Sequence, residues 1–242
     1  MLDFSRFRVI TFDCYGTLID WESGILGALR PILSAHRARI DDPEILRLYG
    51  EFEADAQAGE YRSYREVLRD VVVRLGKRLG FDPTAAEQDS LPESMKNWQP
   101  FPDSVAGLQK LKTKLQVGII SNVDDDLFAA SQRKLQVDFD FVITAAQARA
   151  YKPSLKTFAL AEKKLGIGRS QWLHAGQSVY HDVIPAKSLG LATGWVNRPS
   201  LRPNVGAVRQ ASAQPEIEVH SLAELANLIT SYFGCPTPTR FS

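Results

Sequence analysis

Cysteine is scarce in this chain: Cys14 and Cys235 are the only two among 242 residues. Two thiols make no disulfide framework, and such low usage is typical of a protein kept in a reducing compartment. The opening residues 1–8 also lack the apolar segment of a secretion signal. We therefore expect a cytoplasmic protein.

Long apolar runs and concentrated charge are missing as well. No run approaches the ~20 residues that a helix needs to cross a bilayer. The 29 Lys and Arg residues balance 28 Asp and Glu residues to a net charge of +1, and they form no basic stripe. These absences argue against nucleic acid or an anionic membrane as a partner. With 44% hydrophobic and 24% charged residues, the composition is that of an ordinary globular protein.

What the chain does contain is an alternation of short apolar runs with helical periodicity. The expected strands are 7–12, 117–120, 141–144, 172–176 and 192–196. The segments between the last four carry apolar residues at helical spacing. Near-continuous apolar strands that alternate with helices predict an α/β protein, with a parallel sheet covered on both faces in a Rossmann-like three-layer core.

The stretch between the first two expected strands has a different pattern. Helical spacing recurs there without an apolar strand, in 25–33, 45–56, 64–79 and 84–97. Pro31 is expected to kink or restart the first of these helices. We therefore predict a core made of residues 1–20 and 100–242, with an inserted helical cap of residues 21–99.

Polar side chains stand at the ends of the expected strands. Asp13 follows the first strand, Ser121 and Asn122 the second, Lys152 comes after the third, and Asp182 lies past the fourth. Ligands of open parallel sheets bind beyond the carboxyl ends of the strands, so we expect these residues to share one rim. Asp13 is a candidate nucleophile that forms a covalent ester. The competing interpretation is an ordinary turn aspartate.

The other rim residues also have a chemical and a structural interpretation. Ser121 and Asn122 suit an anion at a helix start, and they equally suit a helix N-cap. Lys152 would supply a fixed positive charge beside the nucleophile, with Asp182 as its counter-ion, although a lone lysine is more often a solvated surface charge. The acids 124–126 are interpreted as first-turn charges of a helix rather than metal ligands.

Four sets of residues together resemble the four motifs of the haloacid dehalogenase superfamily of hydrolases: Asp13, Ser121-Asn122, Lys152-Pro153 and 176–182. The resemblance covers the core from about residue 6 to 198 and keeps the order of the family. Residues 21–99 look like that superfamily's helical cap of the first type.

Two departures from the superfamily pattern narrow the expected chemistry. Most members are magnesium-dependent phosphatases with a second Asp two residues after the nucleophile and a Gly-Asp start to the fourth motif. Tyr15 and Gln177 occupy those positions here. The chain therefore lacks both the leaving-group acid and a carboxylate of the kind that magnesium prefers.

Both departures match the L-2-haloacid dehalogenase (type II) branch, whose first motif reads Asp-x-Tyr-Gly-Thr, as residues 13–17 do. The resemblance implies a small-molecule 2-haloacid as substrate, and neither a metal nor another cofactor. It implies that Asp13 displaces halide to form an ester, which water then hydrolyses to a 2-hydroxyacid. Halide leaves without a proton, so this reaction needs no acid at position 15.

The resemblance also assigns roles to individual side chains. The implied catalytic residues are Asp13, Thr17, Ser121, Lys152 and Asp182. The implied substrate-binding residues are Cys14 and Tyr15, through their backbone groups, together with Asn122, Arg47 and Ser178. The dehalogenase branch uses a cap arginine at the leaving halide, and Arg47 is the candidate here, with Arg62 and Arg65 as competitors. For any one of these arginines, a surface position is the simpler interpretation.

Other functions stay open at this point. A phosphatase of the same superfamily would recruit magnesium by another route, through Asp125 or Asp126. A non-catalytic binding protein on this scaffold is a second alternative, and hydrolysis of a strained ring through the same Asp13 ester is a third. A homodimer is compatible with such folds, although no helix pattern requires it.

Overall fold

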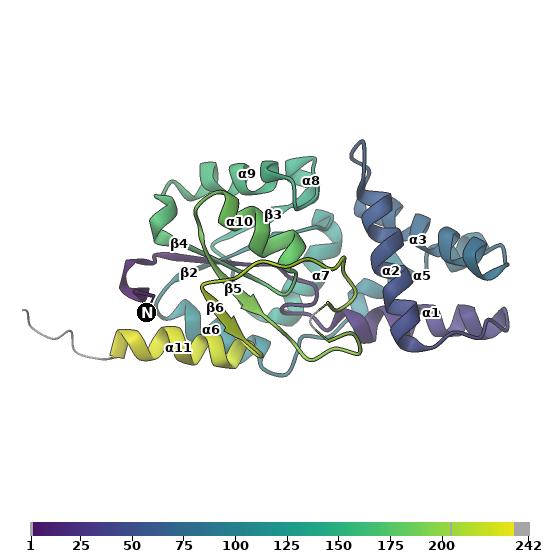
Figure 1. Ribbon diagram of the computed structural model, residues 1–242, viewed down its shortest axis with the longest axis horizontal. Coiled ribbons are helices and arrows are strands. Elements are labelled where there is room, and N and C mark those ends of the chain that lie inside the picture. Colours follow the sequence, from purple (N-terminus) through teal and green to yellow (C-terminus); the bar gives the residue numbers. More distant parts are fainter. Residues whose placement is uncertain (1, 204, 235–242) are drawn as a thin grey trace, which may run out of the picture.

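The computed structural model describes residues 2–203 and 205–234 of the chain. Cys235 and the expected frayed tail 235–242 lie outside the described residues. Figure 1 shows a sheet sandwiched between helices, with a separate group of helices to one side. Among the described helices, none is both long and apolar enough to span a membrane.

The core is one parallel sheet in the order β3-β2-β1-β4-β5-β6. Its strands are β1 (Val9–Phe12), β2 (Gln116–Ser121), β3 (Phe141–Thr144), β4 (Trp172–Gly176), β5 (Ala192–Val196) and β6 (Ile217–Val219). All five neighbouring pairs are parallel. The predicted α/β class and parallel sheet are confirmed. Strand β6 was not expected, because a three-residue run with exposed Glu218 at its centre carries little apolar signal.

Helices cover both faces of this sheet (Figure 1). Helices α6 (Ser104–Lys112) and α11 (Leu222–Gly234) lie on one face. Helices α8 (Ala145–Ala148), α9 (Leu155–Leu165) and α10 (Ile184–Ser188) lie on the other. Ile10 belongs to the larger apolar cluster, while Val9 packs in a second cluster with Phe158 of α9.

The remaining core elements are helix α7 (Asp125–Leu135), a π-turn at Val179–Val183, and 3₁₀ turns at Phe4–Arg6 and Arg169–Gln171. The sequence predicted one continuous helix over 179–189. In the structure this segment begins with the π-turn and continues as α10. That wider turn carries Asp182 beside the end of β4, where Gly176 leaves room for it. A Cβ at position 176 would lie 2.3 Å from Asp182 Oδ2.

The helices between β1 and β2 form a bundle of their own (Figure 1). They are α1 (Trp21–Ala35), α2 (Asp42–Gln57), α3 (Tyr64–Leu79), α4 (Ala85–Gln88) and α5 (Ser90–Ser94), followed by a 3₁₀ turn at Met95–Asn97. Helix α1 runs through Pro31. The single fourth helix expected over 84–97 is divided into three short pieces, with a break at Asp89. The boundaries 1–20, 21–99 and 100–242 stay a prediction, and we refer to the α1–α5 bundle as the cap.

Candidate active site

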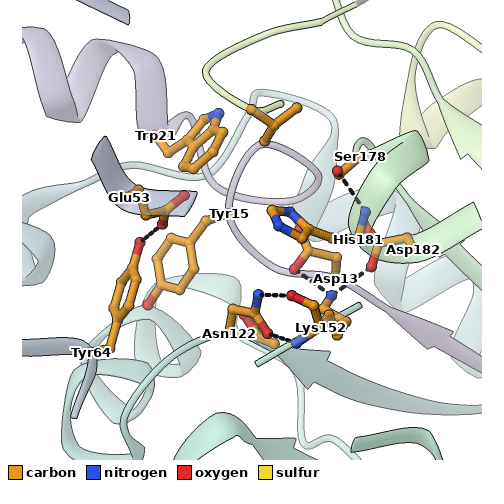
Figure 2. Close-up of a pocket in the computed structure, with 12 residues that line it drawn as sticks. Asp13, Tyr15, Trp21, Glu53, Tyr64, Asn122, Lys152, Ser178, His181 and Asp182 are labelled. Atoms are coloured by element: carbon orange, nitrogen blue, oxygen red, sulfur yellow. Dashed lines mark hydrogen bonds and ion pairs between the residues drawn. The ribbon is translucent and has the colours of Figure 1, made fainter. Parts of the chain in front are cut away.

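A small cavity of about 30 Å³ lies between the carboxyl ends of the sheet strands and the cap. Figure 2 shows the side chains that surround it. Those from the core are Asp13, Tyr15, Ser121, Asn122, Lys152, Ser178, His181, Asp182 and Val208, and those from the cap are Trp21, Glu53 and Tyr64. The structure therefore brings together the rim residues that the strand ends predicted.

Asp13 is held at the end of β1 by two side-chain donors. Thr17 Oγ1 donates to its Oδ2 at 3.0 Å, and Lys152 Nζ donates to its Oδ1 at 3.0 Å. The turn that follows needs Gly16, which has a φ of 86°. A Cβ at position 16 would lie 2.8 Å from the indole nitrogen of Trp21. The carboxylate is thus fixed in one orientation at the floor of the cavity.

Lys152 joins two buried carboxylates. Its ammonium is 1% exposed and donates to Asp13, to Asp182 Oδ1 at 2.5 Å and to the Ile120 carbonyl at 2.8 Å. Burial opposes its charge, but the two carboxylates outweigh burial and raise the pKa of Lys152. The lysine therefore stays protonated and supplies the fixed charge that the sequence predicted.

The two carboxylates titrate differently although they share this lysine. Burial raises the pKa of Asp13 to about 6, against the opposing effect of Lys152. Burial also acts on Asp182, but its shorter contact with Lys152 and a hydrogen bond from His174 prevail and lower its pKa to about 2. Asp182 is thus the permanent counter-ion, and Asp13 is the carboxylate that is easier to protonate.

His174 of β4 completes a buried chain that sequence reasoning missed. Trp172 Nε1 donates to Thr11 Oγ1 at 2.8 Å, and Thr11 Oγ1 lies 2.8 Å from His174 Nδ1. His174 Nε2 lies 3.1 Å from Asp182 Oδ1. Burial lowers the pKa of His174, so the neutral ring accepts at Nδ1 and donates at Nε2. This chain orients Asp182, whose other oxygen, Oδ2, is buried with no partner in the described structure.

Ser121 and Asn122 play different parts although they are adjacent. Ser121 Oγ lines the cavity and has no hydrogen-bond partner among the described residues, so it is available to a ligand. The Asn122 amide instead brackets the backbone of Lys152, accepting from its N–H at 2.7 Å and donating to its carbonyl at 3.1 Å. Asn122 therefore positions the lysine in addition to lining the cavity.

The first-motif residues after Asp13 form the wall of the site in two different ways. Tyr15 lines the cavity, but its hydroxyl bonds with Ser131 Oγ at 3.0 Å in the core. Its hydroxyl is thus bonded to the core rather than to Asp13. Cys14 is fully buried and does not line the cavity, and its carbonyl accepts from the N–H groups of Leu18 and Ile19. The assignment of the Cys14 backbone to substrate binding stays a prediction.

The residues here do not fit a magnesium ion bound in the manner of the phosphatases. Gln177 does not line the cavity, and its amide donates to the Val205 carbonyl at 3.3 Å. Asp125 accepts from Thr144 Oγ1, and Asp126 pairs with Arg65, so neither reaches the cavity. Within the described ranges, no group of three or more His, Cys, Asp and Glu side chains is placed to hold a metal.

The cap arginines lie outside the cavity. Arg47 pairs with Glu44 at 2.6 Å and Glu51 at 2.7 Å on the exterior of α2, with 42% of its side chain exposed. Arg62 bonds with Asp70, and Arg65 bonds with Glu93 and Asp126. The proposed contact between Arg47 and substrate is therefore wrong in this structure, because the face of α2 that carries Arg47 turns to solvent.

Glu53 and Tyr64 line the cavity from the cap but were not predicted as site residues. Glu53 lies four residues after Tyr49 and three before Ala56, within the buried face of α2. An acid inside an apolar helical stripe is a signal that could have identified it. From the core, His181 also reaches the cavity, and burial lowers its pKa to about 4, so its ring is neutral. Ser178 lines the cavity and accepts from the His181 N–H.

Asp124 fastens the cap to the core. It begins α7 but makes no capping bond there. Its carboxylate instead accepts from the backbone N–H groups of Tyr64 at 2.9 Å and Arg65 at 3.0 Å, in the first turn of α3. A carboxylate at a helix N-terminus is stabilised by those unpaired donors and by the helix dipole. The sequence predicted that the acids 124–126 lie at the start of a helix. Asp125 and Asp126 lie in the first turn of α7, whereas the Asp124 carboxylate binds the start of α3 in the cap.

A family model of haloacid dehalogenase-like hydrolases matches residues 7–190. The (S)-2-haloacid dehalogenase of Pseudomonas fluorescens is 25% identical over 228 residues, which are 91% of this chain and 95% of that protein. The rhythmically expressed gene 2 protein of Drosophila melanogaster is 29% identical over 231 residues, 83% of this chain and 86% of that protein. A solved L-2-haloacid dehalogenase from Xanthobacter autotrophicus, with chloropropionic acid covalently bound, is 21% identical with a TM-score of 0.78, covering 93% of this chain and 98% of that chain.

Proposed function

Since the chain belongs to the haloacid dehalogenase-like hydrolase family, we propose that it converts a 2-haloacid to a 2-hydroxyacid through an ester on Asp13, without a metal. The observation that carries this proposal is the clamp on Asp13, whose two oxygens are aligned by Thr17 and Lys152 at the cavity floor. Tyr15 offers no acid beside it, which suits a leaving group that departs without a proton.

In the first step, Asp13 attacks the carbon that bears the halogen. A C–O bond forms to the carboxylate, and the C–halogen bond breaks with its electron pair going to halide. The free hydroxyl of Ser121 is positioned to hold the substrate carboxylate. Lys152 keeps Asp13 ionised above its pKa of about 6 and orients it for attack.

In the second step, water attacks the carboxyl carbon of the Asp13 ester and the bond from that carbon to the product oxygen breaks. One proton of the water leaves on the hydroxyl of the 2-hydroxyacid, and the other is released to solvent. The unpartnered Oδ2 of Asp182 and the neutral ring of His181 are the acceptors available to orient this water. Lys152 and Thr17 stabilise the negative charge that develops on the ester oxygen. Asp13 is regenerated as a carboxylate.

The test is halide release from each enantiomer of 2-chloropropionate in the presence of a chelator. We expect release, together with an added mass on the peptide containing Asp13 after brief exposure to substrate. A single turnover in ¹⁸O-water should place the label in the Asp13 carboxylate and leave the first product unlabelled. Label in that first product would show direct attack by water, and no halide release at any pH would refute the proposed activity. A cytoplasmic location and a homodimer stay predictions.

A further inference from the structure

The cap presents one acidic side chain to the cavity that holds Asp13. Glu53 of α2 is 4% exposed and lines the cavity together with Asp13. Among the described lining residues, Lys152 is the only cation that is permanently charged, and it lies between Asp13 and Asp182. An ionised Glu53 would repel both a substrate carboxylate and a departing halide, so its protonation state matters to the site.

Hydrogen bonds to Glu53 leave one of its oxygens free for a ligand. Tyr64 donates to Oε1 at 2.6 Å, which uses its only hydroxyl proton, so Tyr49 donates to the Tyr64 hydroxyl at 3.0 Å and lies 3.4 Å from Oε1. Figure 2 shows the bond from Tyr64 and the position of Glu53 above Tyr15. Oε2 has no partner among the described residues. With Oε1 accepting from Tyr64, a neutral Glu53 carboxyl carries its proton on Oε2.

The surroundings of Glu53 together raise its pKa and so favour its protonated form. Burial raises its pKa to about 7, the Tyr64 and Tyr49 hydroxyls oppose this shift, and the charge of Asp13 adds to it. From the core, Tyr151 faces it as a neutral phenol, with its own pKa raised by burial and by neighbours that include Glu53. No Lys or Arg side chain pairs with Glu53 in the described structure.

We propose that Glu53 contacts the departing halogen and donates a hydrogen bond to it from Oε2. The inference rests on the proposed dehalogenase activity and adds the leaving-group contact that Arg47 does not provide. As the C–halogen bond breaks, the electron pair goes to halide, which is held by Oε2–H while the proton remains on Glu53. The contact helps most where the halide is a poor leaving group and a strong hydrogen-bond acceptor, in the order fluoride, chloride, bromide.

This role predicts a pH dependence that a structural glutamate would not produce. Asp13 must be ionised and Glu53 protonated, so kcat/KM should be bell-shaped, falling below about pH 6 and above about pH 7. The amide of Glu53→Gln keeps a donor that does not titrate. We expect E53Q to lose the alkaline limb and to keep roughly a tenth of the activity at the optimum.

Removing the Glu53 carboxyl tests its contact with the halide, because the loss of activity should depend on which halide leaves. Glu53→Ala should lower kcat by about 100-fold with a chloride substrate, by less with bromide and by more with fluoride. Glu51→Gln, on the exposed face of the same helix, is the matched control and should keep the wild-type profile. Melting curves at the assay pH confirm that the variants are folded. If E53Q keeps the wild-type alkaline limb and E53A loses the same factor for every halide, the proposal is overturned.

Chloride binding separates this inference from the proposed activity, because it needs no turnover. The chloride-35 NMR line of a buffered chloride solution should broaden with wild-type protein, and the broadening should grow as the pH falls through about 7. E53Q should broaden the line equally across that range, and E53A should not broaden it. Such a result supports the contact even if no haloacid is turned over. Broadening that is absent, or that is identical in all three proteins, refutes it whatever the activity assay gives.

Discussion

The two sides of the cavity are built by different rules. On the core side, Asp13, Ser121, Lys152 and Asp182 come from separate strand ends, and Lys152 joins the two carboxylates through bonds of 3.0 Å and 2.5 Å. On the cap side, Trp21 and Tyr64 begin α1 and α3, and Glu53 lies on the buried face of α2. The core side is charged, and its two carboxylates share one lysine. The cap side consists of two aromatic side chains, Trp21 and Tyr64, and one carboxyl, Glu53.

This difference separates the steps of the proposed reaction. The core side holds the nucleophile and the groups that act on the ester, so its parts must keep fixed distances. The cap side meets the part of the substrate that leaves, and it can change without disturbing the nucleophile. We infer that a change on the core side abolishes the chemistry, whereas a change on the cap side shifts which leaving groups are accepted. The predictions below test that division.

The largest effect is expected at the nucleophile. Asp13→Asn preserves the shape of the side chain but removes the attacking carboxylate, so halide release should fall by at least about 10⁴-fold. The peptide that spans position 13 should gain no mass from substrate. The melting temperature should not fall, because one buried charge is removed. Residual release above a hundredth of the wild-type rate would mean that another group attacks.

Removing the lysine should be nearly as severe. Lys152→Met leaves Asp13 and Asp182 buried without their shared cation, which is expected to cost about 3–5 kcal/mol of folding free energy. Activity should fall by about 10²–10³-fold. Since Lys152 opposes the burial effect on Asp13, its loss should raise the pKa of Asp13 above about 6 and move the acid limb of the pH profile upward.

The matched control for this variant is Lys156→Met, which removes an exposed lysine at the start of α9. It should leave the pH profile, the rate and the denaturant midpoint unchanged. If K152M keeps the wild-type acid limb, the lysine does not control the ionisation of Asp13, and the core side is less tightly coupled than its hydrogen bonds indicate.

The core half of the site was predictable from sequence because strand ends are a one-dimensional signal. Asp13 and Ser121 lie within one residue of a strand terminus, and the parallel topology places all such ends at one edge. The cap half was not predictable in the same way. Whether Arg47 or Glu53 faces inward depends on the rotation of α2, and that rotation is set by packing against α1 and α3. Helix α11 was missed for a simpler reason, since no helix or strand was predicted beyond residue 196.

An intermediate effect is expected at Asp124, whose carboxylate links the core to helix α3 of the cap. Asp124→Ala removes the acceptor for two N–H groups at the start of α3, so we expect a loss of about 2 kcal/mol in unfolding free energy. Tyr64 belongs to that same turn and lines the cavity, so kcat/KM should fall about tenfold, mainly through KM, while the nucleophile is untouched. Denaturant melts and initial rates measure the two effects.

Asp126→Ala is the control for this fastening, because Asp126 pairs with Arg65 across the same boundary but with 65% of its side chain exposed. An exposed pair is worth less than about 1 kcal/mol, so D126A should change both quantities little. Equal losses in the two variants would show that negative charge at the boundary, rather than the hydrogen bonds from Asp124 to the start of α3, holds the α1–α5 bundle in place.

The smallest effect is expected at Arg47, and it is the sharpest test of which cap residue meets the leaving group. Its guanidinium bonds with Glu44 and Glu51 on the solvent side of α2, so Arg47→Ala should change kcat/KM by less than about twofold for every halide and stability by less than about 1 kcal/mol. Rates with bromide and chloride substrates, compared beside E53A, give the answer. A drop in kcat that grows from bromide to chloride in R47A, with E53A unaffected, would mean that α2 rotates during turnover and brings the arginine to the halide. The cap would then change conformation during turnover, and Glu53 would line the cavity only before the substrate reacts.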